Sequence, residues 1–165
     1  MLNKIYLITL AVFVVILGVL TFLAYDWLGS VSNPSVVEAN YSAYLSYGRM
    51  FLFISTLVLL ILANIIFWKT RQTWTFWATL IYFVVFILIQ NFWLDGAFNQ
   101  FQIDKKMSDS TFSPNPLVGV LLCVAAGIFV FFNQFLIKRM HDRMFASAAP
   151  LKELSDDAEI TEVAN

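Results

Sequence analysis

The chain has 165 residues, of which 60% are hydrophobic and 13% are charged, and its formal net charge is −1. Soluble globular domains carry about 25% charged residues, so the composition excludes an ordinary soluble protein. The charge gives no reason to expect a nucleic-acid partner. A single cysteine, Cys123, and a single histidine, His141, exclude an internal disulfide, a multi-thiolate metal site and a bis-histidine haem built from one chain. We therefore expect no cofactor.

Four apolar runs make up most of the chain and contain no Asp, Glu, Lys, Arg or His. They cover residues 5–24, 50–68, 74–94 and 117–137. A helix needs about 20 such residues to span the hydrocarbon layer of a bilayer, which is about 30 Å thick. We therefore predict an all-α membrane protein in which residues 1–145 form a four-transmembrane-helix bundle. We expect an integral, multi-pass protein of the bacterial inner (plasma) membrane.

The first run begins like a secretory signal, because Lys4 precedes it. Its apolar stretch is longer than the roughly 7–15 residues of a signal core, and residues 23–26 make a poor cleavage site. We expect this run to be retained as a span.

The basic residues near the ends of the runs predict the orientation, because cytoplasmic loops are enriched in Lys and Arg. With four spans, one side carries Lys4, Lys69, Arg71, Lys138, Arg139, Arg143 and Lys152, and the other carries Arg49, Lys105 and Lys106. The tryptophans, which prefer the headgroup level, also cluster at the two predicted boundaries. We therefore expect both termini in the cytoplasm (N-in/C-in).

The connection at residues 69–73 is so short that spans two and three must be antiparallel neighbours. Asn115-Pro116 predicts a helix start, because Asn caps free N–H groups and Pro suits the first helical turn. Asn33-Pro34 repeats this signal, and if it also starts a helix, residues 34–48 form an outer segment that leads into span two, with a bend at Gly48. Similar residues at corresponding span ends suggest two parallel-repeat helical hairpins. The alternative is that interface chemistry alone repeats at span ends, and the spacing within the two halves is not constant.

The last segment, residues 146–165, is acidic and includes Asp156, Asp157 and Glu159. Segments with few large apolar residues and clustered like charge do not form a packed core. We predict a disordered acidic cytoplasmic tail, which either docks a partner or only increases solubility.

Polar side chains inside the runs are the candidates for function, because polar groups in lipid are costly unless they pair. The intramembrane amides are Asn64, Gln90, Asn91, Asn133 and Gln134. Amides in membrane helices commonly hydrogen-bond helices together, each contributing about 1–2 kcal/mol or less. We favour this structural interpretation, and a polar pathway lined by the amides is the alternative.

Small residues recur every four positions in the fourth run, at Gly119, Cys123 and Gly127. Helices approach one another closely along such stripes. The stripe predicts a tight helix contact, either within the bundle or, as the less favoured alternative, with another protein.

Three charged residues, Asp26, Arg49 and Asp95, lie at the outer ends of three different spans. They could form an interfacial ion pair or the mouth of a cation site, and two carboxylates could carry out acid–base chemistry. The favoured interpretation is that they mark the boundary where lipid ends.

The sequence contains no Gly-rich phosphate loop, no paired-histidine zinc helix and no Ser nucleophile elbow, so no catalytic or metal-binding residue is assigned. We interpret the chain as a non-catalytic accessory or assembly subunit that packs against partner helices, with the lipid bilayer and other membrane proteins or self-association as partners. The alternative is an oligomeric channel or small-solute transporter with an amide-lined pathway. An enzyme acting through Asp26 and Asp95 is a third hypothesis.

Overall fold

The computed structural model describes the backbone of residues 1–30, 34–106 and 115–163, and the side chains of residues 1–28, 36–37, 39–106, 115 and 117–145. The helices are α1 (Leu2–Ser30), α2 (Pro34–Thr70), α3 (Trp74–Leu88), the π-helix η1 (Ile89–Leu94), α4 (Asp95–Asp104) and α5 (Pro116–Val163). No strand occurs in these ranges. Because α3, η1 and α4 follow one another without a break, the described chain forms four rods.

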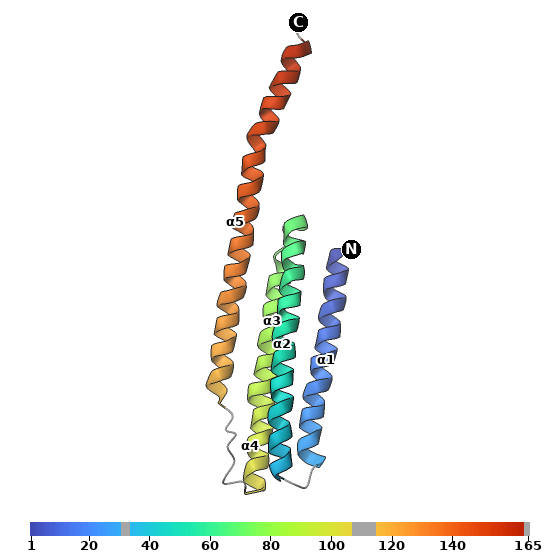
Figure 1. Ribbon diagram of the computed structural model, residues 1–165, viewed down its shortest axis with the longest axis vertical. Helices are drawn as coiled ribbons and strands as arrows, with labels where there is room; N and C mark the ends of the chain where they lie inside the picture. Colours follow the sequence, from blue (N-terminus) through green and yellow to red (C-terminus); the bar gives the residue numbers. More distant parts are fainter. Residues whose placement is uncertain (31–33, 107–114, 164–165) are drawn as a thin grey trace.

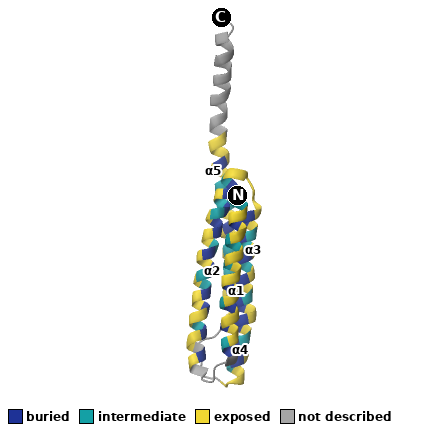
Figure 2. Cartoon of the chain, turned by 90° about the vertical axis from the view of Figure 1, so that its right-hand side faces the viewer, coloured by how far each residue is buried: buried dark blue, intermediate teal, exposed yellow. Residues whose placement is uncertain are grey.

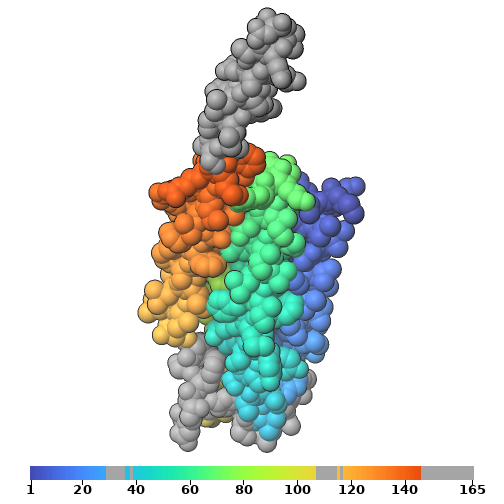
Figure 3. Space-filling view, turned by 45° about the horizontal axis from the view of Figure 1, so that its top comes forward, coloured from blue at the N-terminus to red at the C-terminus, as the bar shows by residue number. Residues whose placement is uncertain are grey.

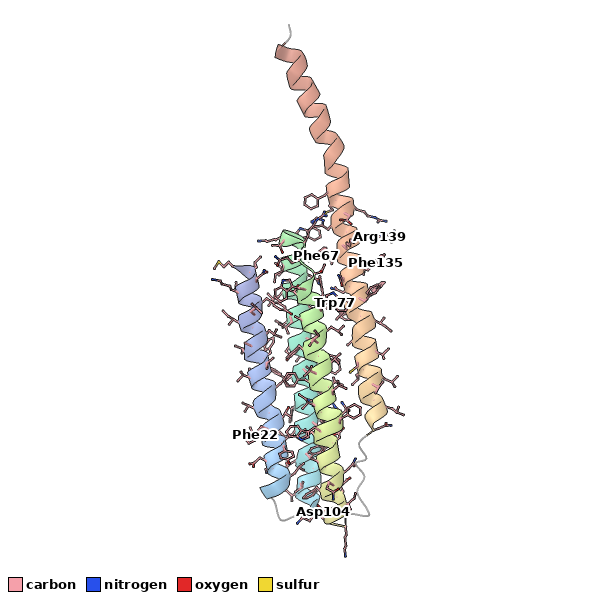
Figure 4. The ribbon with its side chains drawn as sticks, turned by 180° about the vertical axis from the view of Figure 1, so that it is seen from behind. Phe22, Phe67, Trp77, Asp104, Phe135 and Arg139 are labelled. Atoms are coloured by element: carbon pink, nitrogen blue, oxygen red, sulfur yellow. The ribbon has the colours of Figure 1, made fainter. Side chains whose placement is uncertain are left out.

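The four rods lie side by side, with α2 and α3 in the middle, α1 on one side and α5 on the other (Figure 1). Both chain ends point to the same end of the bundle, which also holds the α2–α3 turn. We call this the basic end and the opposite one the far end. Figure 4 shows Arg139 near the basic end and Asp104 at the far end, while Phe22 of α1 and Phe135 of α5 point away from opposite sides.

All four rods contain a stretch long and apolar enough to cross a membrane. The stretches are Leu2–Leu28, Ala39–Thr70, Trp74–Asp104 and Leu117–Phe145. The prediction of an all-α, four-helix membrane bundle is therefore confirmed, and the chain is a multi-pass integral membrane protein by this criterion.

The helix boundaries follow the local signals in the sequence. α2 begins at Pro34 and α5 at Pro116. Asn115 caps α5, because its Oδ1 accepts a hydrogen bond of 3.0 Å from the backbone N–H of Leu117. Between α2 and α3 the chain reverses at Arg71, which has a left-handed φ of 55° and donates its N–H to the carbonyl of Phe67. These helix starts and the antiparallel α2–α3 pair confirm the predictions for both.

The main hydrophobic core lies between α1, α2 and α3, with one face of α5 against it. Figure 2 shows the buried positions on the inner faces of the helices and the exposed ones outside. Thr75 Oγ1 has no hydrogen-bond partner among the described residues, but other hydroxyl groups buried in this core pair with each other: Tyr6 contacts Thr79 Oγ1 at 2.8 Å, and Ser55 contacts the Tyr82 hydroxyl at 2.7 Å. Such pairing removes the cost of a polar group in a dry interior.

A second, smaller core lies at the far end, between the end of α1, the start of α2 and α4. Its buried members are Ala24, Leu28, Val37, Tyr41, Leu45, Leu94, Phe98 and Phe101. The 37 residues of α2 measure about 55 Å at 1.5 Å per residue, well beyond the hydrocarbon thickness. α2 is therefore longer than one membrane span requires, and the far-end core holds α1, α2 and α4 together at this end.

Two predictions remain predictions. The side chains of residues 146–165 lie outside the described part of the chain, and α5 continues as a helix to Val163, so a separate acidic tail is not tested. The two hairpins run in the same direction (Figure 1), which a parallel repeat requires but which does not test duplication.

Candidate functional site

The π-helix η1 turns two polar side chains toward α2. Buried residues recur every four positions along this rod: Thr75, Thr79, Phe83, Ile87, Asn91 and Asp95. In an α-helix each residue turns by about 100°, so a residue four positions further on points about 40° away from the first. After five such steps the side chain would point to roughly the opposite face of the helix. A π turn holds more residues, since its bonds run from i to i+5, and here the Asp95 N–H donates to the Gln90 carbonyl. The wide turn adds about one residue and so removes about 100° of this drift, roughly half of it, which favours the inward placement of Asn91 and Asp95.

Arg49 of α2 meets these side chains. Its Nη2 donates to Asn91 Oδ1 at 3.1 Å and lies 3.7 Å from Asp95 Oδ2. The second carboxylate oxygen, Asp95 Oδ1, accepts a hydrogen bond of 2.9 Å from the Tyr41 hydroxyl, two helical turns before Arg49. Tyr41, Arg49, Gln90, Asn91 and Asp95 together form what we call the far-end cluster.

Two glycines allow the close packing around this cluster. A Cβ at Gly119 of α5 would lie 2.7 Å from Asn91 Cγ, closer than atoms approach in folded proteins. A Cβ at Gly48 of α2 would lie 3.2 Å from Gln90 Nε2. Because Gly119 has no side chain, the start of α5 can pack directly against Asn91. The missing side chain of Gly48, the residue before Arg49, likewise leaves room for the Gln90 amide.

An aromatic pair of η1 and α1 indicates the level at which the cluster would lie in a bilayer. Trp93 of η1 stacks on Tyr25 of α1, with ring centroids 4.9 Å apart, and both rings are partly exposed. Stacked amphipathic rings of this kind prefer the interfacial layer. Asp95 is only 2% exposed even so. Its charge is balanced by Arg49, which is the condition under which a buried carboxylate is tolerated.

Two polar atoms of the cluster have no hydrogen-bond partner within the described residues: Arg49 Nε and Gln90 Oε1. Both atoms are buried, and the Gln90 side chain as a whole is almost completely so, with 3% of the residue exposed. An unsatisfied buried polar group costs about 1–3 kcal/mol. The far-end cluster is thus charge-balanced but incompletely hydrogen-bonded.

The amides near the basic end have a different arrangement. Asn64 of α2 and Asn133 of α5 exchange two hydrogen bonds, with Nδ2–Oδ1 distances of 3.3 Å and 2.8 Å. Gln134 is half-buried on α5 and does not join this pair. Each asparagine donates one hydrogen bond to the other and accepts one from it, so the pair ties α2 to α5.

His141 is a buried residue that the sequence did not single out. It is 4% exposed, and its Nδ1 lies 2.9 Å from Arg71 Nη2. Because Arg can only donate, Nδ1 is the acceptor in this contact. The rings of Trp68 and Phe145 pack around it, with centroid distances of 5.5 Å and 4.4 Å. This contact joins the α2–α3 turn to α5.

The other residues named from the sequence do not gather. Asp26 is exposed and makes no ion pair with a described residue, so it stands apart from Arg49 and Asp95. Cys123 and Gly127 are half-buried, and a Cβ at Gly127 would meet nothing within 4 Å. The small-residue stripe is therefore needed for packing inside the chain at Gly119 but not at Gly127.

An apolar cavity of about 240 Å³ lies at mid-bundle between α2, α3 and α5. It is lined by Phe53, Thr56, Leu57, Phe83, Leu122, Ala125, Ala126, Phe129 and Val130. Figure 3 shows α2 and α5 side by side on this face with α3 visible between them.

Over the described residues, no three His, Cys, Asp or Glu side chains gather closely enough to hold a metal ion. The chain matches no protein-family model, and no curated protein or solved structure is significantly similar to it. Function must therefore be argued from the geometry of this chain alone.

Proposed function

We propose that the protein is a non-catalytic accessory or assembly subunit of the bacterial inner (plasma) membrane, and that α5 is the helix that contacts its partner. The observation that carries this proposal is the difference in burial among the spans. In their most apolar windows, 39% of α2 and 44% of the α3 rod are buried inside the chain, but only 6% of α5. The corresponding share for α1 is 17%, so the fourth helix has the fewest fully buried residues of the four and leaves its outer face for lipid or for another protein.

The packing of the small residues supports a protein partner on α5. Membrane helices associate through close packing at small residues, since burying apolar surface gains little in lipid. Gly127 has open space where a Cβ would be, so contacts within the chain do not require a glycine there. The apolar cavity beside Ala126 and Phe129 also leaves room for a large side chain of a second helix.

The chemistry of the polar groups also favours an assembly role over a polar pathway. Asn64 and Asn133 are occupied with each other at one end, and Gln90 and Asn91 lie at the other. Between the two ends the described core is mainly apolar, and the buried hydroxyls of Ser55 and Tyr82 pair with each other. A channel or transporter would therefore require a path formed between several copies of the chain.

The substitution Gly127→Leu tests this proposal. It adds bulk to the open part of the α5 stripe, so a partner helix seated there is displaced while the isolated chain keeps its fold. We expect tagged wild-type protein, purified in mild detergent from its native host, to retain a stoichiometric membrane-protein partner that Gly127→Leu loses. Gly18→Leu on α1 is the matched control, because a Cβ at Gly18 also meets nothing within 4 Å.

The contrary results are specific. A homogeneous monomer or homo-oligomer from the native host, with no stoichiometric partner, contradicts the accessory role. Equal loss of the partner in Gly18→Leu contradicts the assignment to α5. Solute flux into proteoliposomes that disappears in Asn64→Leu, with folding intact, would instead support the channel or transporter alternative.

A further inference from the structure

The far-end cluster contains one unused donor and one unused acceptor. Gln90 Oε1 is the acceptor, and Arg49 Nε is the donor. The Gln90 amide packs against Gly48, the residue directly before Arg49, with its Nε2 3.2 Å from where a Cβ would lie. Both groups are therefore presented by the same contact between α2 and η1.

The neighbouring polar groups already have partners, which leaves these two unsatisfied. Arg49 Nη2 is shared between Asn91 Oδ1 and the Asp95 carboxylate, and the Tyr41 hydroxyl donates to Asp95 Oδ1. Asn91 Nδ2 donates to the Ile87 carbonyl at 2.8 Å. A buried polar group in a native protein is nearly always satisfied by protein, water or ligand.

We propose that Arg49 and Gln90 bind a hydroxyl group of a lipid whose headgroup is glycerol or a sugar. A hydroxyl is both an acceptor, for the Arg49 Nε–H, and a donor, for Gln90 Oε1. A neutral group fits better than an anion, because Asp95 already balances the charge of Arg49 and would repel a phosphate.

The depth of the site makes a lipid the source of this hydroxyl. The stacked Trp93–Tyr25 pair marks the headgroup level beside η1. The two unused atoms are enclosed, but the Arg49 side chain is 28% exposed and is the member of the cluster that can turn outward. The headgroup therefore enters when Arg49 turns, and the acyl chain stays in the bilayer.

The experiment compares two amphiphiles that differ only in their hydroxyl groups. Purified protein in a phosphocholine detergent, which has no hydrogen-bond donor, is titrated with 1-monooleoylglycerol or with its dimethyl ether. The midpoint of thermal unfolding and native mass spectrometry report binding, because a ligand of the folded state raises its stability. We expect saturable binding of monooleoylglycerol and binding of the ether that is about fivefold to tenfold weaker, the effect of losing about one hydrogen bond.

Three variants locate the site. Gln90→Met removes the acceptor, and Arg49→Lys removes Nε while keeping the charge, so each should weaken monooleoylglycerol binding by about fivefold to tenfold. Gln134→Met is the matched control near the basic end and should bind like wild type. Two independent variants keep the test valid if one of them folds poorly, which circular dichroism would reveal.

Each contrary result overturns the proposal. Equal binding of the ether, or wild-type affinity in both Gln90→Met and Arg49→Lys, rules out this hydroxyl site. No dependence on either amphiphile indicates that an ordered water alone fills the position. Saturation by free glycerol at the same concentrations shows that the ligand is a soluble polyol and not a lipid.

Discussion

The two contacts between helices that involve amide side chains, one near each end of the bundle, differ in how their polar groups are paired. The Asn64–Asn133 pair is neutral, and each amide satisfies the other. The far-end cluster uses an Arg–Asp ion pair, a tyrosine and two amides, and still leaves Arg49 Nε and Gln90 Oε1 without partners. A closed pair of like groups is sufficient to join two helices. The far-end cluster contains more polar groups than are needed to hold two helices together, and two of them have no hydrogen bond to a described residue. It also lies on a π turn, and π turns often mark functional positions.

The largest loss of stability that tests this comparison is expected from removal of the buried Asp95 carboxylate. Asp95→Leu leaves Arg49 and Tyr41 without their partner, so we expect a loss of about 2–4 kcal/mol in the free energy of unfolding, less than for a fully buried pair because Arg49 is partly exposed. Equilibrium unfolding in mixed detergent measures it.

The double variant Arg49→Met/Asp95→Leu is the control, because it leaves no uncompensated charge. Its loss should be smaller than that of Asp95→Leu alone. A larger loss that equals the sum of the two single effects would show that Arg49 and Asp95 do not interact.

The second test concerns the contact of α5 with the cluster. Gly119→Ala places a Cβ 2.7 Å from Asn91 Cγ, and Asn91 cannot yield easily because both Ile87 and Arg49 hold its amide. We expect a loss of about 1–3 kcal/mol from overpacking. Gly127→Ala on the same helix has open space and should be neutral or slightly stabilising. Similar losses in both variants would attribute the effect to the helix and not to the contact.

The third test applies to the closed pair. Asn64→Leu leaves Asn133 with an unsatisfied amide, so we expect a loss of about 1 kcal/mol. The double variant Asn64→Leu/Asn133→Leu removes both polar groups and should recover most of that loss, as measured by the same unfolding assay. A double variant much less stable than either single one would contradict a purely structural pair.

The smallest change in the free energy of unfolding is expected at Gln90, and it is an increase where the other variants show a decrease. In a detergent without hydroxyl groups, Gln90→Met removes an unsatisfied buried acceptor and should raise the free energy of unfolding by about 0.5–1 kcal/mol. Gln134→Met, which lies outside the cluster, should change it by less. If Gln90→Met were clearly destabilising, Gln90 would have a partner that this geometry does not contain.

The sequence predicted many members of the far-end cluster without predicting the cluster. Gln90 and Asn91 were grouped as intramembrane amides, while Arg49 and Asp95 were grouped with Asp26 as boundary charges. The structure places Gln90, Asn91, Arg49 and Asp95 together, leaves Asp26 outside and adds Tyr41. Tyr41 precedes Arg49 by eight residues on α2, two turns along one face, and that spacing was the available signal.

His141 was missed for a related reason. As a lone histidine it had no partner within its own segment except Asp142, and its hydrogen bond comes from Arg71 in a turn far away in the chain. Contacts of this kind have no local spacing by which the sequence could reveal them.

The sequence alone determined the four spans, the helix starts at Pro34 and Pro116 and the antiparallel α2–α3 turn. These are local properties, because apolar length, proline geometry and loop length act within a few turns of helix. Only the tertiary structure decided which polar side chains meet, since this depends on the rotation and height of each helix relative to its neighbours. The wide η1 turn changes the rotation of the rod just before Asp95, which pairs with Arg49, and no residue pattern within that turn signals it.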